Sequence, residues 1–518
     1  IPFFAVLFFN LFHIKTDFSF WKYINSTMIL TALLSSLCLV RWLTYPFLKT
    51  DFYMDLSWIF PKVEKTLSYS LSAILSPLLA TVFVLSWILS IVMIMVQRIK
   101  GLRIGGGKIE FSVGRNHEKA RTGTMTDCKV DGKLSQYLFN PKVAILISSA
   151  FLLYLNYYAY FPSLNPLGKP VSVDILYNYV PALERFELMG LTPQGIAILF
   201  ESPEVRPVVM LSLFVMKNLL YLSYIDTVKL SLFLSGLLLA FASYYSLKMA
   251  TGNEILSAAS IYFSTFSFQT VVGLYAGYLG MWIAASLELL TISFLSRAVD
   301  AEDFRKLIPA IFLSVLALLS HPWSWFLFTM AILALFPLNL LLSHIGIQRR
   351  YTKGQAAILA AFFLIHLIPE ILRQTLFNSP STISLVQGAF SWGTASVQNF
   401  LLFHLNLNYL LEQYVGGFFS NFLIYILSIG GAISALRHDG ALFHFIFSSL
   451  VVVSPIFFIC DYRVQCRILY FLPLQLISTL GLFDLLRASK GNLDVATSFS
   501  ATMLPLMNYA FRSIANFV

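Results

Sequence analysis

Long apolar runs separated by short polar segments dominate the chain. A membrane-spanning helix needs roughly 20 mostly apolar residues, and the runs 71–96, 230–247 and 326–342 approach or reach that length with few charges. Because these runs are unbroken rather than alternating, they predict spanning helices and not barrel strands. We predict about 13 spans, near 1–12, 27–48, 70–96, 142–161, 227–247, 254–269, 277–296, 307–320, 323–344, 355–372, 417–436, 441–459 and 467–485.

Lys and Arg residues test this series of crossings, because cytoplasmic loops of membrane proteins carry an excess of them. With these spans, the main basic segments fall on one side; they are 13–22, 98–142, 248, 297–306, 348–353, 437–438 and 487–490. The apolar stretch 208–224 would break the alternation if it crossed. We therefore predict a juxtamembrane or re-entrant helix over 205–224, inside an outer loop that spans 163–226. Short outer turns are expected at 268–277, at His321 and at 461–467.

Composition supports an all-α, polytopic membrane helical bundle. With 58% hydrophobic and 12% charged residues, the chain could not cover its own surface in water, which excludes a soluble domain of this size. The net charge of +10 is spread over the segments between apolar runs, so nucleic-acid binding is not expected. Four cysteines without metal-ligand spacing predict neither a disulfide framework nor a metal centre.

We divide the chain into four parts: N-terminal accessory transmembrane helices (1–96), a basic cytoplasmic insert (97–141), a transmembrane core (142–485) with outer loops 163–226 and 373–416, and a C-terminal segment (486–518). The first residue, Ile1, lies inside an apolar stretch, with neither an initiator Met nor a recognisable signal peptide. We therefore do not treat either end of the sequence as a natural terminus.

The stretch from 173 to 190 predicts an amphipathic helix on the outer membrane surface. Its apolar face recurs at helical spacing and consists of Leu176, Tyr179, Val180 and Leu183. Its polar side carries Asp174, Asn178 and Arg185. Pro181 interrupts the pattern and Gly190 is a stop signal. Asp174 begins the helix, where a carboxylate serves either as a cap or as a general base that takes a proton from an acceptor hydroxyl.

Several motifs in and after this helix carry a resemblance to a known family. The helix has the form Asp-x-x-Tyr…Gly-x-x-Pro, and the other motifs are Arg206-Pro207, the segment 248–253, the turn 272–277, a helix ending in Arg297 and the run Ser320-His321-Pro322-Trp323. Over roughly residues 142–485 the chain resembles the GT-C superfamily of membrane glycosyltransferases. The resemblance implies a multi-pass cell-membrane enzyme whose active site faces outward. It would transfer a sugar, with inversion, from a polyprenyl-phosphate donor to a glycan, lipid or protein acceptor.

The resemblance also assigns the general base to Asp174. Members that use a metal carry adjacent acidic residues in this loop, whereas this loop has no Asp-Glu or Asp-x-Asp pair. We therefore favour a metal-independent reaction without a cofactor and predict no metal ligands.

Other candidate residues follow from their own chemistry. Guanidinium groups suit phosphate because they donate parallel hydrogen bonds, so Arg463 and Arg467 are predicted to bind the lipid phosphate. The other predicted lipid-phosphate or substrate ligands are side chains that form hydrogen bonds: His321, Tyr177 and Asn178. Each has a structural alternative, such as snorkelling of the arginines to headgroups or helix capping by His321. Further candidates in the outer segments are Glu201, Arg206, Glu370 and Arg373, of which the last two lie one helical step apart and could simply pair with each other.

Two other classes of function stay open. A transporter or flippase needs ionisable or helix-breaking residues within its spans, and Glu288, Lys217 and several prolines meet that requirement. A structural subunit of a membrane complex could dock through 97–141. The enzyme hypothesis requires Asp174 and Arg463 to converge on one outer cavity, whereas the structural hypothesis expects them to lie far apart.

Overall fold

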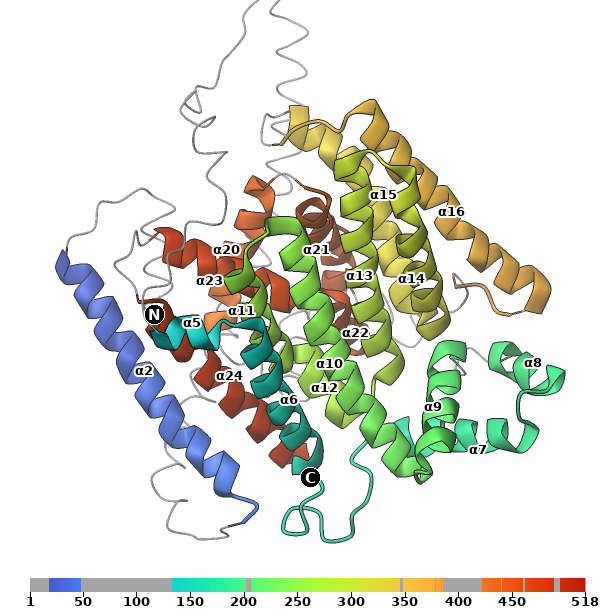
Figure 1. The fold of residues 1–518 in the computed structure, drawn as a ribbon, viewed down its shortest axis with the longest axis horizontal. Helices are drawn as coiled ribbons and strands as arrows, with labels where there is room; N and C mark the ends of the chain where they lie inside the picture. The colour runs from blue at the N-terminus through green and yellow to red at the C-terminus, as the bar shows by residue number, and fades with distance from the viewer. Residues whose placement is uncertain are drawn as a thin grey trace, which may run out of the picture.

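The computed structural model is helical, without strands, in the part of the chain that it describes (Figure 1). That part comprises residues 18–47, 133–172, 174–201, 206–344, 348–377, 379–382, 384, 422–438, 440–459, 462–488 and 494–517. The predicted all-α class is thereby confirmed for these residues. The predicted spans 1–12 and 70–96, most of the insert 97–141 and most of the loop 373–416 lie outside them.

Helices from both ends of the chain pack together on one side of the bundle. They are α2 (Phe18–Thr44), α5 (Lys133–Leu138), α6 (Pro141–Tyr158) and α24 (Val495–Phe517). The helix α2 packs along α24 (Figure 1), and Asn508 of α24 donates a hydrogen bond to the carbonyl of Ser35 at 2.6 Å. A tyrosine of α6 also bonds to the end of α2: Tyr158 Oη donates a hydrogen bond to the carbonyl of Trp42.

The centre of the bundle is a run of consecutive helices: α10 (Tyr224–Thr251), α11 (Glu254–Thr265), α12 (Phe268–Ala276), α13 (Leu279–Ala301), the short 3-10 turn η3 (Phe304–Lys306), α14 (Leu307–Ser320), α15 (Pro322–His344) and α16 (Lys353–Phe377). Polar caps separate several of them. Asn253 accepts from the N–H of Leu256, and Ser267 accepts from the N–H of Thr270. Gly252 and Gly277 end α10 and α12 in the left-handed conformation that glycine adopts without strain.

The C-terminal part adds α20 (Phe422–Arg437), α21 (Ala441–Ile459), α22 (Tyr462–Phe471) and α23 (Leu474–Ala488). The helices α20 and α23 cross at backbone contact, because a Cβ atom on Gly481 would lie 1.8 Å from the carbonyl oxygen of Leu427. Small residues at such crossings allow the close approach on which membrane helix packing depends.

Six described helices or helix pairs are long and apolar enough to cross a membrane, which indicates a membrane protein. They are Ile24–Thr44, Tyr224–Thr251, Glu254–Ala276, Leu279–Ala301, Pro322–His344 and Lys353–Phe377. The described residues thus provide fewer spans than the predicted 13. Helices lie near the expected spans 142–161, 307–320, 417–436 and 441–459 but are not among the six, and the region 467–485 is divided between two helices.

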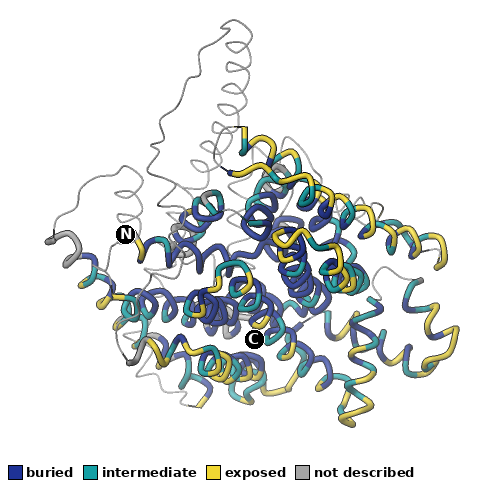
Figure 2. Tube along the Cα trace, turned by 45° about the horizontal axis from the view of Figure 1, so that its top comes forward, coloured by how far each residue is buried: buried dark blue, intermediate teal, exposed yellow. Residues whose placement is uncertain are grey.

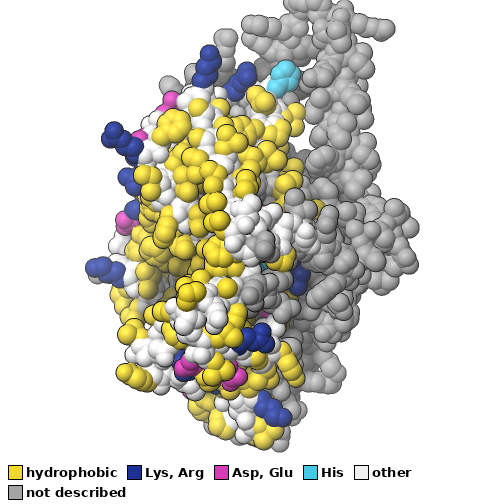
Figure 3. Space-filling model, turned by 90° about the vertical axis from the view of Figure 1, so that its right-hand side faces the viewer, with side chains coloured by type: hydrophobic (Ala, Val, Ile, Leu, Met, Phe, Trp, Pro, Cys, Tyr) yellow, Lys and Arg dark blue, Asp and Glu magenta, His cyan; other side chains and the backbone are white. Residues whose placement is uncertain are grey.

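The interior and the surface of the bundle differ as expected for a protein in lipid. The windows over α11–α12 and α13 are 94% and 89% buried, against 28% for α16, so the former helices are central and the latter is peripheral (Figure 2). Exposed hydrophobic side chains of α16 include Leu364, Ile371 and Leu376. Figure 3 shows hydrophobic side chains over most of the described part of one face, with the charged side chains few. A lipid environment accounts for such a surface.

Contacts between loops define two ends of the bundle. At the end that we name the basic end, Thr352 donates to Glu302 at 2.7 Å and Gln348 donates to the carbonyl of Leu436. These contacts bring the basic segments 297–306, 348–353 and 437–438 together at one end of the bundle. The predicted series of spans also places these segments on one side of the membrane. The opposite end, which we name the loop end, holds η2 (Ile175–Tyr179), α7 (Val180–Met189), α8 (Pro193–Glu201) and α9 (Pro207–Leu220), seen at the lower right of Figure 1.

Three local predictions were wrong. The expected turn 268–277 is mostly the helix α12, which Ser267 caps at its start and Gly277 ends. The expected turn 461–467 is helical from Tyr462 onward. The predicted single span 467–485 is broken between Phe471 and Leu474, since Pro473 lacks an N–H and disfavours helix in the residue before it.

Candidate anion-binding site

The segment that carries Asp174 begins with one π-helical turn, η2, and continues as α7. The wider turn brings Ile175, Tyr179, Leu183 and Phe186 onto the buried face, and each is at most 2% exposed. The predicted apolar face was therefore right for Tyr179 and Leu183 but wrong for Leu176, which is exposed. Gly190 ends α7 as predicted.

Asp174 lies at the start of η2, against the start of α13. Its backbone N–H donates to Ser172 Oγ at 3.1 Å, and Ser172 Oγ donates to the carbonyl of Ala276 at 2.6 Å. Its carboxylate accepts a hydrogen bond from Asn178 Nδ2 at 3.0 Å and makes no helix-capping hydrogen bond. Gly277 is required beside it, because a Cβ atom there would lie 2.3 Å from Ser172 Oγ. In this structure the Asp174 side chain thus does not cap the helix that it begins.

Tyr179 links this segment to Arg206. Its hydroxyl oxygen accepts from the N–H of Gly280 at 3.1 Å and from Arg206 Nη1. Burial raises the pKa of Tyr179 despite the nearby guanidinium, so the hydroxyl is neutral at physiological pH. Arg206 passes over Gly280, where a Cβ atom would lie 2.4 Å from Arg206 Cδ. The Nε–H of Arg206 is buried and has no acceptor among the described residues.

His321 caps α15 and stays neutral. Its Nδ1 accepts from the backbone N–H of Ser324 at 3.2 Å, which assigns the ring proton to Nε2. Burial lowers the pKa of His321 well below its usual range, and the nearby guanidiniums of Arg206 and Arg467 lower it further. The ring therefore combines the predicted capping role with a free N–H donor at Nε2.

Arg206, His321 and Arg467 together form what we name the cationic cluster. Neither arginine forms an ion pair with a carboxylate of the described residues. Asp174 lies near enough to influence the pKa of Tyr179, which bonds directly to Arg206. The site thus presents N–H donors from three separate elements, without a described anion to receive them. Such an arrangement suits an anionic ligand.

The structure places the remaining predicted residues elsewhere or leaves their side chains undescribed. Asn178 is beside Asp174, and Tyr177 is 74% exposed on η2. Glu370 and Arg373 pair with each other, with Arg373 Nε to Glu370 Oε2 at 2.8 Å, and Thr382 completes the pair. Glu201 is the last residue of α8, and Arg463 is on α22 with Arg467, but the side chains of both lie outside the description.

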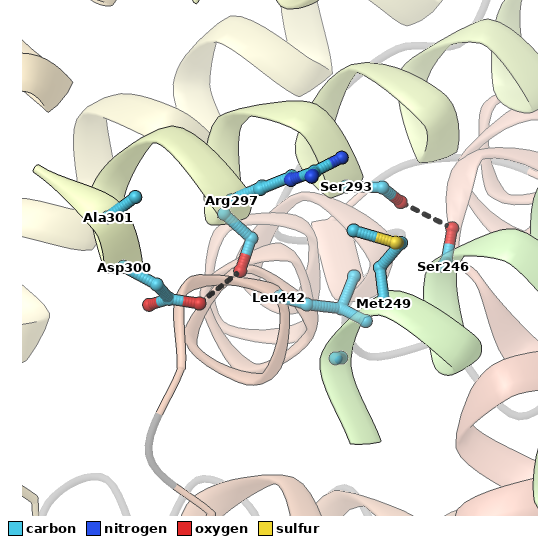
Figure 4. A pocket seen from close by; sticks show the side chains of 9 residues that line it. Ser246, Met249, Ser293, Arg297, Asp300, Ala301 and Leu442 are labelled. Carbon is cyan, nitrogen blue, oxygen red and sulfur yellow. Dashed lines mark hydrogen bonds between the residues drawn. The ribbon is translucent and has the colours of Figure 1, made fainter. Parts of the chain in front are cut away.

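A separate cavity of about 300 Å³ lies at the basic end, between α10 and α13. In its lining, Ser293 Oγ donates a hydrogen bond to Ser246 Oγ at 2.7 Å, with Met249 nearby (Figure 4). Gly280 and Arg297 lie on the same helix, about 25 Å apart at 1.5 Å per residue, so this cavity is remote from the cationic cluster. Ser246 and Ser293 bond to each other, Ser296 bonds to Asp300, and Arg297 also lines the cavity. We assign the candidate site to the cluster because it groups two guanidiniums and a histidine donor close to Asp174.

No protein-family model matches the chain, and a search of curated proteins also finds no match.

Two site residues escaped the sequence analysis. The hydroxyl of Tyr179 was counted only as part of an apolar face, and Gly280 was not considered. The signal for Gly280 was its small size at the start of an apolar helix, directly after a Gly-capped one. The part that it plays depends on a contact with Arg206, which is distant in the sequence.

Proposed function

We propose that the chain is a membrane glycosyltransferase that moves a sugar from a polyprenyl-phosphate donor to an acceptor hydroxyl. The observation that carries the proposal is the cationic cluster: two guanidiniums without a described carboxylate partner, grouped with a neutral histidine donor and close to Asp174. The resemblance of residues 142–485 to the GT-C superfamily adds the class of donor.

The charge of the cluster fits a phosphate monoester or diester better than a neutral solute. Arg206 and Arg467 supply positive charge, and His321 supplies a hydrogen bond without adding to the charge. Interactions of this kind stabilise the negative charge that develops on a leaving phosphate. The exposed apolar surface of the surrounding helices suits a lipid-linked donor that arrives through the membrane.

The proposed step exchanges one C–O bond for another. The acceptor oxygen attacks the anomeric carbon of the sugar from the face opposite the phosphate, and the bond between that carbon and the phosphate oxygen breaks. The hydroxyl proton passes to the Asp174 carboxylate, which Asn178 orients by its hydrogen bond at 3.0 Å. The polyprenyl phosphate leaves with the bonding electron pair, and the configuration at the anomeric carbon inverts. Arg206, Arg467 and His321 would receive the phosphate charge.

We also propose that the reaction does not require a metal and that it occurs at the outer face of a cell membrane. The lone carboxylate of the loop supports the first statement, because it provides one base and no acidic pair. The gathering of basic segments at the end of the bundle opposite the cluster supports the second, by the positive-inside rule.

The proposal is tested by transfer of radiolabelled sugars from a panel of polyprenyl-phosphate donors into lipid and protein fractions of membranes that contain the chain. Replacing the base by Asp174→Asn should lower transfer by at least about 100-fold, the usual contribution of a general base. The matched control is Glu184→Gln, an exposed carboxylate on the adjoining α7, which should keep the wild-type rate. Equal transfer by the wild type and Asp174→Asn would remove Asp174 from the role, and the absence of transfer with every donor would contradict the proposed activity.

A transporter or flippase is a second candidate, and one observation favours it. Glu288 is buried within α13, a helix that could span a membrane, and one of its carboxylate oxygens has no hydrogen-bond partner in the described part of the chain. Lys217 gives no such support, because it pairs with Glu187 at 2.7 Å.

A further inference from the structure

A small, mostly apolar cavity with three polar side chains in its lining lies inside the bundle, away from the cationic cluster. It is lined by Gln269, Glu288 and Gln475, which come from α12, α13 and α23. These side chains are at most 3% exposed. Glu288 is eight residues beyond Gly280 on α13, which places the cavity about 12 Å along the helix from the cluster.

Each of the three polar residues of the lining has a buried oxygen atom without a donor among the described residues. The oxygens Oε1 of Gln269, Glu288 and Gln475 are all buried and have no hydrogen-bond partner among the residues that the structure describes. The amide of Gln269 cannot be turned around to supply a donor, because its Nε2 already donates to the carbonyls of Tyr470 and Leu472. The amide Nε2 of Gln475 donates to Ser243 at 3.3 Å. In this orientation of the Gln475 amide, three residues of the lining each hold an acceptor without a donor among the described residues.

The carboxylate of Glu288 also lacks a compensating charge. No basic residue lines the cavity among the residues that the structure describes, and none of the described ion pairs includes Glu288. An isolated buried carboxylate is costly and is neutralised either by a proton or by a bound cation. A cation would also satisfy the two amide oxygens of the lining. A bridging water would satisfy acceptors but would leave the charge in place.

The position of the cavity agrees with a cation site. It lies beside the break between α22 and α23, where Pro473 also lines it, and beside the start of α12. Interrupted helices expose carbonyl groups and bind small cations inside membrane proteins. The cavity has a volume of about 10 Å³, close to the space that one water-sized sphere occupies.

We propose that Glu288, Gln269 and Gln475 bind one monovalent cation of the size of Na⁺. The site is independent of the proposed sugar transfer, since it shares no residue with the cationic cluster. Binding to the folded protein alone stabilises it by mass action.

The test compares thermal unfolding of the purified, detergent-solubilised chain in the chlorides of Na⁺ and of a large organic cation, at equal ionic strength and about pH 8. Na⁺ should raise the melting temperature by a few degrees. Glu288→Gln should abolish this rise, and the control Glu254→Gln, at the exposed start of α11, should retain it. If Glu288→Gln does not fold, Gln475→Met provides the second variant and should reduce the rise.

Two results would overturn the proposal. The first is a melting temperature that is the same with Na⁺ and with the organic cation, or a Na⁺ effect that persists in both variants. The second is stability that rises on acidification to about pH 5 whichever cation is present and that loses this dependence in Glu288→Gln, because a proton would then occupy the site. Neither readout depends on transfer activity.

Discussion

At the residue scale, His321 shows how surroundings fix the state of a titratable group. Burial, with Arg206 and Arg467 nearby, holds its pKa low, and the N–H of Ser324 occupies Nδ1. The neutral ring can donate to a phosphate from Nε2, whereas a protonated ring would add a third positive charge to the cluster.

This state predicts a pH-dependent stability. The unfolded chain takes up a proton on His321 near pH 6.5, whereas the folded ring does so only at lower pH. The stabilisation is therefore complete above about pH 6.5 and is lost as the pH falls below it, where the unfolded state binds more protons. Melting temperatures of the wild type should fall between about pH 7 and pH 5, and His321→Asn, which keeps a capping acceptor, should show a smaller fall.

The control for this measurement is His344→Asn at the exposed end of α15, which should keep the wild-type pH dependence. An equal fall for the wild type and His321→Asn would show that the ring is not held neutral by the fold.

At the scale of elements, the sequence analysis predicted most central helices but not their interruptions. The runs that became α10, α13, α15 and α16 are long and apolar, so their existence followed from hydropathy. The break before Pro473 had a local signal in the proline itself, whereas the helix α12 occupies a segment that was predicted to be a turn. The helix α24, within a C-terminal segment for which no structure was predicted, is stabilised by packing on α2 from the other end of the chain.

The crossing of α20 and α23 gives a prediction at this scale. Gly481→Ala places a methyl group against the carbonyl of Leu427, where it would lie 1.8 Å away, so the helices must separate. Overpacking of this kind costs about 1–3 kcal/mol, and thermal unfolding in detergent should show a lower melting temperature. Ile429→Ala, at an exposed position on α20, is the control. A Gly481→Ala melting temperature equal to that of the wild type would contradict the backbone contact.

At the scale of the whole molecule, the basic segments and the cationic cluster lie at opposite ends of the bundle. The basic segments meet at one end through contacts such as Thr352 with Glu302, and the cationic cluster lies toward the other. Single residues of the cluster could be selected from the sequence, because Arg467, His321 and Arg206 stood in outer segments. Their grouping could not be predicted, since it depends on how α9, α14 and α22 pack around the start of α13.

The central claim is that the cationic cluster binds the phosphate of a lipid-linked sugar. Arg467 tests it most directly, because its side chain has no hydrogen bond or ion pair within the described structure and can be replaced with little cost to folding. The measurement is equilibrium binding of radiolabelled polyprenyl-phosphate sugars to the purified wild type, to Arg467→Gln and to Arg487→Gln, an exposed arginine at the end of α23. Loss of a hydrogen bond to a charged group should weaken binding by about 10- to 100-fold in Arg467→Gln, with no change in Arg487→Gln. Equal affinities for all three proteins would contradict the claim.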